Sequence, residues 1–401
     1  MRRCWQFQTA GQLIFGTGAV RTTGQLLGRR GWTRVLVITD AQLSALGLVS
    51  GVAQSLREAG IQYEVFDASE PEPSLRIADQ AVAEADRLQP DAILGLGGGS
   101  NMDLAKIVAA VVTHGGSPRD YFGFDRIPGP VTPLVCMPTT AGTGSEVSHA
   151  AVLTDEDNKI KVSTLSPHLR PALAIVDPEL TQSCPPQLTG DSGIDALTHA
   201  IEAYTATRFA ELEANDGEPL AYEGAHPLGG CLAEKAIALI AQHLVRAVRN
   251  GNDAQAREGM ALAATLAGMA FSSCGVALVH ALEYPIGGEL HCTHGAGNGL
   301  LLPYVMRFNL PVRTEAFARI AQLLGHDTRG LSMEEAAETA AGAVDQLRAE
   351  IGIPQRLREL GARPEQLPVF AAKSFAIKRL LQTNPRPATE ADLLDILRAA
   401  Y

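Results

Sequence analysis

A short apolar strand that runs straight into a glycine-rich turn constrains the fold of this chain more than any other feature. The apolar residues 92–94 are followed by Gly-Leu-Gly-Gly-Gly-Ser at 95–100, and a helix-forming stretch begins directly after them. Glycines let backbone N–H groups approach a ligand without obstruction by Cβ atoms, and a helix N-terminus adds positive potential. The alternative is a plain strand–helix turn. Four glycines in five residues exceed what such a turn needs, so we interpret the segment as a phosphate-binding loop.

Strand-like and helix-like stretches alternate through the first part of the chain. Strands are expected at 35–38, 63–66, 92–94, 134–137, 150–153 and 172–176. This alternation predicts an α/β domain with a largely parallel sheet. Beyond 185–186, helical patterns dominate, at 194–204, 232–249, 254–272, 314–324, 333–351 and 390–401. We therefore predict an α/β domain over residues 1–182 and an all-helical domain over residues 183–401, with an exposed loop at 209–226.

The amino-acid composition indicates which binding partners and which cellular compartment to expect. The 401 residues include 33 Lys and Arg against 44 Asp and Glu, and the net charge of -11 argues against a nucleic-acid binder. The six cysteines form no close pairs, which favours a reducing compartment. No apolar run approaches the roughly 18 residues of a membrane helix, and polar residues interrupt the N-terminus before a signal-like stretch forms. We expect a cytoplasmic protein with small-molecule partners, and neither nucleic acid nor membrane among them.

Two further features could contact a dinucleotide. Asp40 ends the strand at 35–38, where its carboxylate could accept hydrogen bonds from an adenosine ribose and repel a 2′-phosphate. It could equally cap the following helix, which the local sequence alone favours. In the usual dinucleotide fingerprint the acidic residue lies about 20 residues after the glycines, so this pattern differs from it. The loop at 138–146, Pro-Thr-Thr-Ala-Gly-Thr-Gly-Ser-Glu, also offers hydroxyl groups and glycines, although such turns are common.

One carboxylate and several histidines are spaced as metal ligands could be. Asp195 and His199 stand at i and i+4, so on a helix they share one face. Asp195 also has capping-box spacing from Ser192, which is the plainer interpretation of that pair alone. Downstream, His280 lies in an apolar, helix-like stretch and His294 follows it closely. A lone buried histidine is usually a core residue, but the combination makes a site of three histidines and one carboxylate plausible, which suits Fe(II) or Zn(II).

Taken together, these motifs resemble those of the iron-containing (group III) alcohol dehydrogenase family. The similarity covers nearly the whole chain. In order, its motifs are Phe15-Gly-Thr-Gly18, the stretch from Gly97 to Lys106, the loop at 138–146, Gly193-Ile-Asp195-Ala-Leu-Thr-His199-Ala-Ile-Glu202, His294-Gly295 and Thr383-Asn-Pro-Arg-Pro387. The resemblance implies a dinucleotide-binding α/β domain and a helical metal-binding domain in a dehydroquinate synthase-like architecture, with the active site in the cleft between them.

The resemblance also implies roles for single residues, carried over by matching position. The implied metal ligands are Asp195, His199, His280 and His294, with Fe(II) expected rather than Zn(II). The implied cofactor contacts are Asp40, Gly97, Gly98, Ser100, Asp103, Thr139, Thr140, Thr143 and Lys161. Asp40 suggests NAD over NADP, and family habit suggests a homodimer or a higher homo-oligomer.

Three departures from the family pattern bear on the reaction. Many members carry a second histidine four residues after the third ligand, whereas this chain has Tyr284, whose reference pKa of about 10 is far from that of histidine. The Tyr-Pro pair at this point and the insertion at 209–226 are similar to those of the hydroxyacid–oxoacid transhydrogenase branch. Glu72 stands where many members carry Asn before Pro, which bears on one cofactor contact.

The predicted function is hydride transfer between an alcohol and NAD, with aldehyde or ketone reduction in reverse, and a divalent metal as Lewis acid. Tyr284 and His291 are the candidate catalytic residues, as proton relays. The alternatives are a transhydrogenase that keeps NAD bound, a non-redox enzyme on the related sugar-phosphate cyclase scaffold, and a non-catalytic binding protein. The sequence leaves the substrate open.

Overall fold

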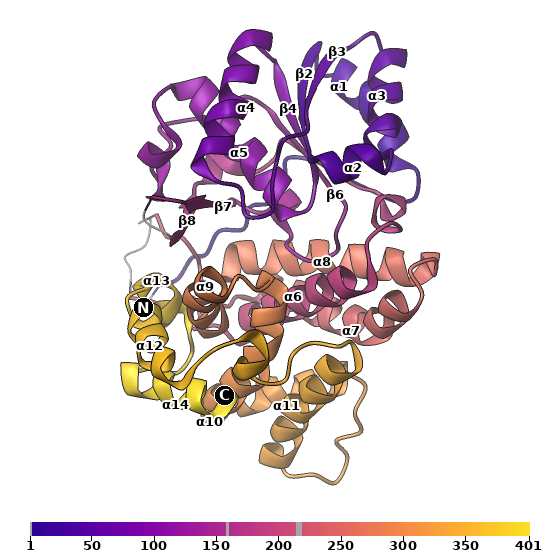
Figure 1. Ribbon diagram of the computed structural model, residues 1–401. Coiled ribbons are helices and arrows are strands. Elements are labelled where there is room, and N and C mark those ends of the chain that lie inside the picture. Colours follow the sequence, from indigo (N-terminus) through magenta and orange to yellow (C-terminus); the bar gives the residue numbers. More distant parts are fainter. Residues whose placement is uncertain (1, 158–159, 214–218) are drawn as a thin grey trace. The chain divides into compact units, whose positions relative to one another are not determined.

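The computed structural model describes residues 2–157, 160–213 and 219–401, and these form two compact units. One unit comprises residues 8–184, and the other joins residues 1–7 to residues 185–401. In Figure 1 the first unit is drawn in indigo to magenta and most of the second in orange to yellow. The first unit is α/β and the second is helical, which confirms the fold class expected from the sequence.

A six-stranded parallel sheet forms the centre of the α/β unit. Its strands lie in the order β1-β9-β6-β4-β2-β3. Their bounds are β1 Leu13–Phe15, β2 Arg34–Ile38, β3 Gln62–Phe66, β4 Ala92–Gly97, β6 Leu134–Pro138 and β9 Leu173–Val176. Every residue of β4 and β6 is buried, because helices cover both faces of the sheet and the strands can therefore be continuously apolar. The sequence did not predict β1, which has only three half-buried residues.

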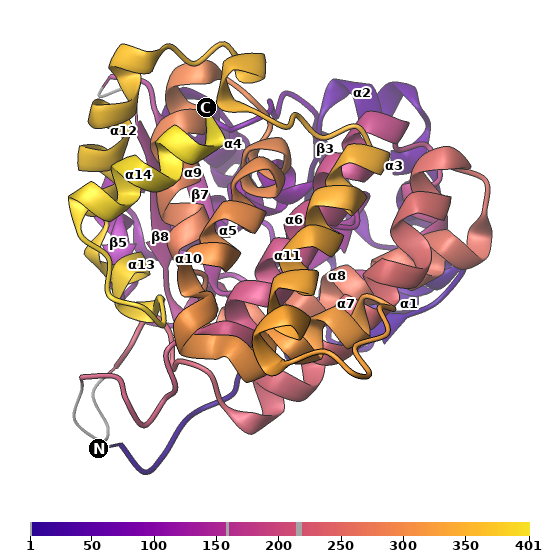
Figure 2. The ribbon, with the colours of Figure 1, turned by 90° about the horizontal axis from the view of Figure 1, so that it is seen from below.

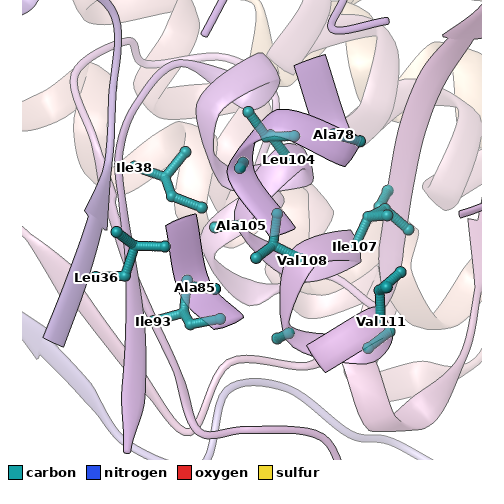
Figure 3. Packing of buried hydrophobic residues seen from close by; sticks show 14 of the residues in the cluster. Leu36, Ile38, Ala78, Ala85, Ile93, Leu104, Ala105, Ile107, Val108 and Val111 are labelled. Atoms are coloured by element: carbon teal, nitrogen blue, oxygen red, sulfur yellow. The ribbon is translucent and has the colours of Figure 1, made fainter. Parts of the chain in front are cut away.

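Helices pack on the two faces of this sheet in two separate apolar clusters. The flanking helices are α1 Thr23–Gly28, α3 Leu48–Glu58, α4 Leu75–Leu88 and α5 Gly99–His114. Leu36 and Ile38 of β2 face α4 and α5, where Val108 packs (Figure 3). Val35 and Val37, the alternate residues of the same strand, lie in the cluster with α1 and α3. Each fully buried side chain of this kind contributes roughly 1.5–3 kcal/mol, so the sheet is a firm base for the loops at its edge.

A second, three-stranded sheet lies outside the largely parallel sheet that the sequence predicted. Its strands are β5 Gly123–Phe124, β7 Ala150–Asp155 and β8 Ile160–Leu165, in the order β5-β8-β7. The strand expected at 150–153 therefore pairs antiparallel with β8, outside the main sheet. Burial alternates along β7, which is typical of an antiparallel sheet with one covered face and not of a buried parallel strand.

Helices form the second unit almost entirely. They are α6 Pro186–Thr205, α7 Pro227–Arg249, α8 Ala254–Cys274, α9 Leu278–Leu290, α10 His294–Leu323, α11 Met333–Glu350, α12 Leu367–Phe375, α13 Lys378–Thr383 and α14 Glu390–Ala400. Within this unit α6 packs against α7, α8 and α10, and α10 also packs along α11, as Figure 2 shows. The helix expected at 314–324 is the part of α10 that follows a kink, because the backbone leaves helical geometry at Arg313. The sequence did not predict the part of α10 before this kink, which contains Pro303 and Pro311.

One described helix, α7, is long and apolar enough to cross a membrane by length and composition alone. The pair α8 and α9 meets the same criteria only together and is bent by 105°. However, α7 packs against α6 and α8, and 44% of its most apolar window is buried. The core helix of a soluble protein meets the same criteria, so this finding is weak evidence for a membrane span.

The segment at 209–226 is not simply an exposed loop, as the sequence suggested. Residues 214–218 lie outside the described part of the chain, but Tyr222 and His226 are buried. His226 caps α7, because its Nδ1 accepts a hydrogen bond from the N–H of Gly229 at 3.2 Å. Its ring stacks on that of Trp5 with centroids 4.1 Å apart, and its Nε2 lies 2.9 Å from Oγ of Ser273. The end of this segment thus packs against the N-terminal residues of its own unit.

His226 should make the stability of the protein pH-dependent. Burial lowers the pKa of His226 from 6.5 to about 4, so the unfolded chain binds more protons between these two values. The free energy of unfolding is therefore largest above about pH 6.5 and falls by on the order of 2 kcal/mol as the pH decreases through this window. In His226→Asn, which keeps a capping side chain, this part of the pH dependence should disappear. Urea denaturation at pH 7 and pH 5 measures it, and an equal loss in both proteins would contradict the assignment.

Candidate metal centre and dinucleotide loops

Three loops follow neighbouring parallel strands of the main sheet at their carboxyl ends. Asp40 follows β2, the glycine loop follows β4, and the loop at 138–146 follows β6. Because β4 lies between β2 and β6, these loops are neighbours. Open parallel α/β sheets bind their ligands at this edge. The structure thus places side by side three features that the sequence showed only separately.

The glycine loop is packed too closely to accept side chains. Gly97 has a φ of +149°, and a Cβ on it would lie 2.0 Å from Nδ2 of Asn101. A Cβ on Gly95 would lie 2.9 Å from Cα of Met102, so this glycine lets α5 approach β4. Helix α5 begins at Gly99 with Gly98 as its N-cap, and a glycine has no side chain to cover the first N–H groups. The first turn of α5 can therefore donate these N–H groups to a phosphate.

Asp40 both caps a helix and faces the glycine loop. Its Oδ1 accepts a hydrogen bond from the N–H of Leu43 at 2.9 Å, which makes it the N-cap of α2 (Ala41–Ala45). Its Oδ2 accepts a hydrogen bond from Nδ2 of Asn101 at 2.8 Å, and the same nitrogen lies 3.1 Å from the carbonyl oxygen of Leu96. Asn101, which no sequence motif marked as functional, thus connects the Asp40 carboxylate to the glycine loop.

The loop at 138–146 is attached to the glycine loop directly. The N–H of Thr139 donates to the carbonyl oxygen of Gly97 at 2.9 Å, extending the pairing of β4 with β6. A Cβ on Gly99 would lie 2.9 Å from Cγ2 of Thr143. Thr140 approaches the same loop, because its side chain would be 3.6 Å from a Cβ on Gly98. The predicted threonines therefore line the space next to the glycines.

Asp103 and Lys106 of α5 hold this second loop from inside the protein. Asp103 Oδ1 accepts from Oγ of Ser145 at 2.6 Å, and its Oδ2 accepts from the N–H of Val152 at 3.0 Å. The fully buried Lys106 donates to Oγ of Ser145 at 2.7 Å and to the carbonyl oxygen of Ala150 at 2.7 Å. Burial raises the pKa of Asp103 and lowers the pKa of Lys106, while their mutual attraction opposes both shifts. The geometry gives Asp103 a positioning role behind the loop.

Lys161 and Ser100 both meet Glu72, the residue that departs from the family pattern. Nζ of Lys161 lies 2.5 Å from Oε1 of Glu72, and the N–H of Glu72 donates to Oγ of Ser100 at 3.2 Å. Glu72 itself has a φ of +54°, a left-handed conformation that is uncommon outside glycine. In this structure the carboxylate of Glu72 therefore engages the lysine that the resemblance assigns to the cofactor.

The four predicted metal ligands come from three helices of the second unit. Asp195 and His199 lie inside α6, which begins at Pro186, so Asp195 is not a helix cap. His280 lies in the first turn of α9, and His294 is the first residue of α10. Ligand atoms of Asp195, His280 and His294 all lie within 4.8 Å of one another. Residues that lie far apart in the sequence thus come close together in the folded chain.

His199 stands beside this group of three. Its ring stacks on the ring of His280 with centroids 4.9 Å apart, and its Nδ1 lies 4.0 Å from Oδ2 of Asp195. That nitrogen is buried and has no hydrogen-bond partner among the described residues. Buried polar atoms are nearly always paired, so an orphaned nitrogen here fits a residue that binds a cation. Burial lowers the pKa of His199 to about 4, which keeps the ring in the neutral form that binds metals.

Two buried glutamates orient the histidine rings. Nδ1 of His280 lies 2.6 Å from Oε2 of Glu202, and Nδ1 of His294 lies 2.5 Å from Oε2 of Glu283. A carboxylate accepts hydrogen bonds, so each Nδ1 carries the proton and each Nε2 presents a lone pair. Glu202 belongs to the motif at 193–202, but its contact with His280 could not be predicted from that motif. No sequence pattern pointed to Glu283.

Asp195 is held in its ionised form. Burial alone would raise its pKa, but its electrostatic interactions with the neighbouring histidines and a hydrogen bond from Asn298 outweigh burial and lower it. A buried carboxylate oxygen beside imidazole nitrogens is a donor set that suits Fe(II) or Zn(II). The residues present therefore fit a divalent cation.

The two candidate proton relays are placed differently. The ring of Tyr284 lies 6.0 Å from the ring of His294, and its hydroxyl group forms a hydrogen bond with Arg379. His291 is exposed and ends α9 in a left-handed conformation with a φ of 53°. Tyr284 thus packs beside a candidate ligand. The ring contacts of His294 with His280 and with Tyr284 do not involve His291.

Comparison with known proteins points the same way over almost the whole chain. The family profile "Iron-containing alcohol dehydrogenase" matches residues 10–178, and "Fe-containing alcohol dehydrogenase family, C-terminal" matches residues 218–401. The NAD-dependent methanol dehydrogenase of Bacillus methanolicus is 39% identical over 96% of this chain and 97% of its own length. The 1,3-propanediol dehydrogenase of Klebsiella pneumoniae is 38% identical over 97% of this chain and 96% of its own.

A solved structure agrees with these relatives. The crystal structure of a 1,3-propanediol oxidoreductase superposes with a TM-score of 0.93 at 37% identity, and each chain covers 100% of the other. The fold of this chain thus recurs over its whole length in a structure solved by crystallography.

Proposed function

The chain belongs to the iron-containing alcohol dehydrogenase family, and on that premise we propose which residues let it transfer a hydride between an alcohol and NAD. The enzyme is a metal-dependent oxidoreductase that also reduces the corresponding aldehyde or ketone in reverse. The observation that carries the assignment of residues is the convergence of Asp195, His280 and His294 within 4.8 Å.

Asp195, His199, His280 and His294 would hold the divalent metal, iron rather than zinc by family. When bound, such a cation acts as a Lewis acid that lowers the pKa of an alcohol and polarises a carbonyl group. Glu202 and Glu283 support this chemistry because they fix the proton on Nδ1 of their histidines, so that the lone pair of Nε2 can bind the cation. Tyr284 is the better candidate for a proton relay, since it packs against His294, and His291 is the second candidate.

The cofactor contacts proposed are those at the carboxyl edge of the main sheet. The first turn of α5, with Gly97, Gly98 and Ser100, is suited to the pyrophosphate. Thr139, Thr140 and Thr143 line the adjoining space, and Lys161 can add a positive charge once it leaves Glu72. Asp103 supports the threonine loop from behind and does not need to touch the cofactor.

The substrate class proposed is a short primary alcohol or diol, because the relatives above are named for methanol and 1,3-propanediol. The test is an NAD-linked screen of alcohols, aldehydes and hydroxyacids on protein reconstituted with Fe(II) and, in parallel, with Zn(II). Elemental analysis should accompany the screen. Turnover with a short alcohol is the expected result, and metal-loaded protein without oxidoreductase activity on any member of the panel would contradict the proposal.

Asp40 should decide between NAD and NADP. Its carboxylate would repel a 2′-phosphate, and Asn101 holds it at the edge of the glycine loop. In Asp40→Ser the capping function is kept while the charge is removed, so the KM for NADP should fall by about tenfold or more, corresponding to about 1.4 kcal/mol. Steady-state kinetics with both cofactors measure this ratio. An unchanged preference for NAD would show that Asp40 serves only as a helix cap.

A second candidate function, the hydroxyacid–oxoacid transhydrogenase, is favoured by one observation. The guanidinium group of Arg379 forms hydrogen bonds with Tyr284 and Tyr222, and Tyr284 lies beside His294. A guanidinium can bind a carboxylate through two parallel hydrogen bonds, which would suit a hydroxyacid. The transhydrogenase would retain NAD through purification and exchange hydride between a hydroxyacid and an oxoacid without added NAD. Activity that depends on added NAD would exclude it.

The setting of the enzyme is also part of the proposal. All six cysteines are free thiols, which supports a cytoplasmic location because reducing compartments keep thiols unpaired. We further propose a homo-oligomer, at least a dimer, to be tested by light scattering on the purified protein.

A further inference from the structure

Asn298 of α10 lies where three of the proposed metal ligands converge. Its Nδ2 is 2.8 Å from Oδ1 of Asp195, 3.1 Å from Nε2 of His294 and 3.3 Å from Nε2 of His280. The side chain is completely buried, and Asn298 is one helical turn beyond His294 on the same face of α10. One amide nitrogen therefore touches the ligand atoms of all three residues.

The hydrogen-bond pattern fixes which way this amide points. Both Nε2 atoms are acceptors, because each Nδ1 donates its proton to a glutamate, and the Asp195 carboxylate is an acceptor as well. Turning the amide over would place its oxygen against three acceptors. In the observed orientation Oδ1 of Asn298 is buried and has no hydrogen-bond partner within the described ranges, which destabilises the fold. The contacts of the N–H groups thus persist although they leave the oxygen unsatisfied.

We propose that Asn298 is a positioning residue that keeps the ligand set assembled before a cation binds, an inference that rests on the metal centre proposed above. Lone pairs directed at one point repel one another when nothing lies between them. The N–H groups of Asn298 offset this repulsion between Asp195, His280 and His294 in the metal-free protein. Each Nε2 has one lone pair, so a cation must displace the N–H groups of Asn298 as it binds. Ligands that are already converged lose less conformational freedom in this exchange, so the affinity for the cation is higher.

The test compares the affinity for Zn(II), measured by competition with a chromophoric chelator, in the wild type, Asn298→Ala and Asn298→Leu. Leucine keeps the branched shape of asparagine, with two somewhat larger methyl groups, and removes the donor. Residues that orient metal ligands typically change metal affinity by about 10–100-fold, so both variants should bind Zn(II) that much more weakly. If leucine restored the affinity to within about twofold of the wild type, the side chain would only fill space and the inference would be overturned.

Asn309 provides a matched control on the same helix. It is also buried, and its amide nitrogen donates to Oδ1 of Asn384 at 2.9 Å instead of to a ligand of the centre. Asn309→Ala should lower the melting temperature equally with and without Zn(II), and should leave the affinity for Zn(II) unchanged. In Asn298→Leu, by contrast, the increase in melting temperature on adding Zn(II) should be smaller than in the wild type. Equal losses of Zn(II) affinity in the two variants would attribute the effect to general destabilisation and overturn the inference.

Failure of this inference is distinguishable from failure of the proposed centre. His280→Ala should bind Zn(II) far more weakly than the wild type if the centre is right. If the wild type and His280→Ala bind equally, the centre itself is wrong. If His280→Ala loses Zn(II) but Asn298→Leu binds like the wild type, the centre stands and only the role of Asn298 is refuted.

Discussion

His280→Ala should abolish stoichiometric metal binding and lower NAD-linked turnover by about a thousandfold or more. The variant removes one imidazole from the four proposed ligands, and Glu202 is left buried beside an empty space while still held by the N–H groups of Ala277 and Val279. Lewis-acid stabilisation by a metal is worth several kcal/mol, and about 4 kcal/mol corresponds to a thousandfold in rate. Elemental analysis and steady-state kinetics on the same preparation measure both losses.

His243→Ala is the matched control for this experiment. His243 is a buried histidine of α7 in the same unit, and it packs against Gly259 instead of against the candidate ligands. The control should keep its metal content and turnover even if its melting temperature falls. A His280→Ala protein that kept a full complement of metal would refute the ligand set.

Gly97→Ala should weaken NADH binding by about 10–100-fold. A φ of +149° is costly for any residue with a side chain, on the order of 1–3 kcal/mol. The added Cβ would also lie 2.0 Å from Nδ2 of Asn101, so Asn101 must move and release Asp40. The strain and the lost hydrogen bond both act on the loop that would hold the pyrophosphate. Fluorescence titration with NADH measures the dissociation constant.

Gly31→Ala is a control that separates the effect of backbone strain from an effect on the glycine loop. Gly31 also has a positive φ of +74°, but nothing lies within 4 Å of a Cβ placed there. This control should lose some stability and keep the wild-type affinity for NADH. If Gly97→Ala bound NADH as tightly as Gly31→Ala does, the glycine loop would have no part in cofactor binding.

The α/β core was predictable because its strands are short, apolar and separated by turn signals. Elements without that contrast were missed: β1 has only half-buried residues, and β8 is exposed at its first residue. Proline obscured α10, since Pro303 and Pro311 break the pattern from which helices are recognised. The local sequence thus indicates elements that are buried or periodic. It does not predict elements that packing stabilises without such a pattern.

The candidate centre shows a different limit. Spacing alone could not decide whether Asp195 was a cap or a ligand. The resemblance implied the ligand set, and the structure places Asp195 inside α6, where it caps no helix. Glu283 and Asn298 contact candidate ligands that lie on other helices or one turn away on the same helix. The spacing of residues in the sequence does not reveal such contacts. Those supporting contacts required the folded chain.

The hydrogen bond between Asp40 and Asn101 has a consequence for coenzyme engineering. One end of it belongs to the residue proposed to select the cofactor, and the other belongs to α5, the helix that follows the glycine loop. Substitutions at 40 and 101 are therefore expected to be epistatic, because neighbours that share a bond do not change the free energy independently. A library that varies position 40 alone would test each new side chain next to Asn101, whose amide is placed to donate a hydrogen bond to a carboxylate. Varying the two positions together should yield NADP-accepting variants that single-site screening passes over.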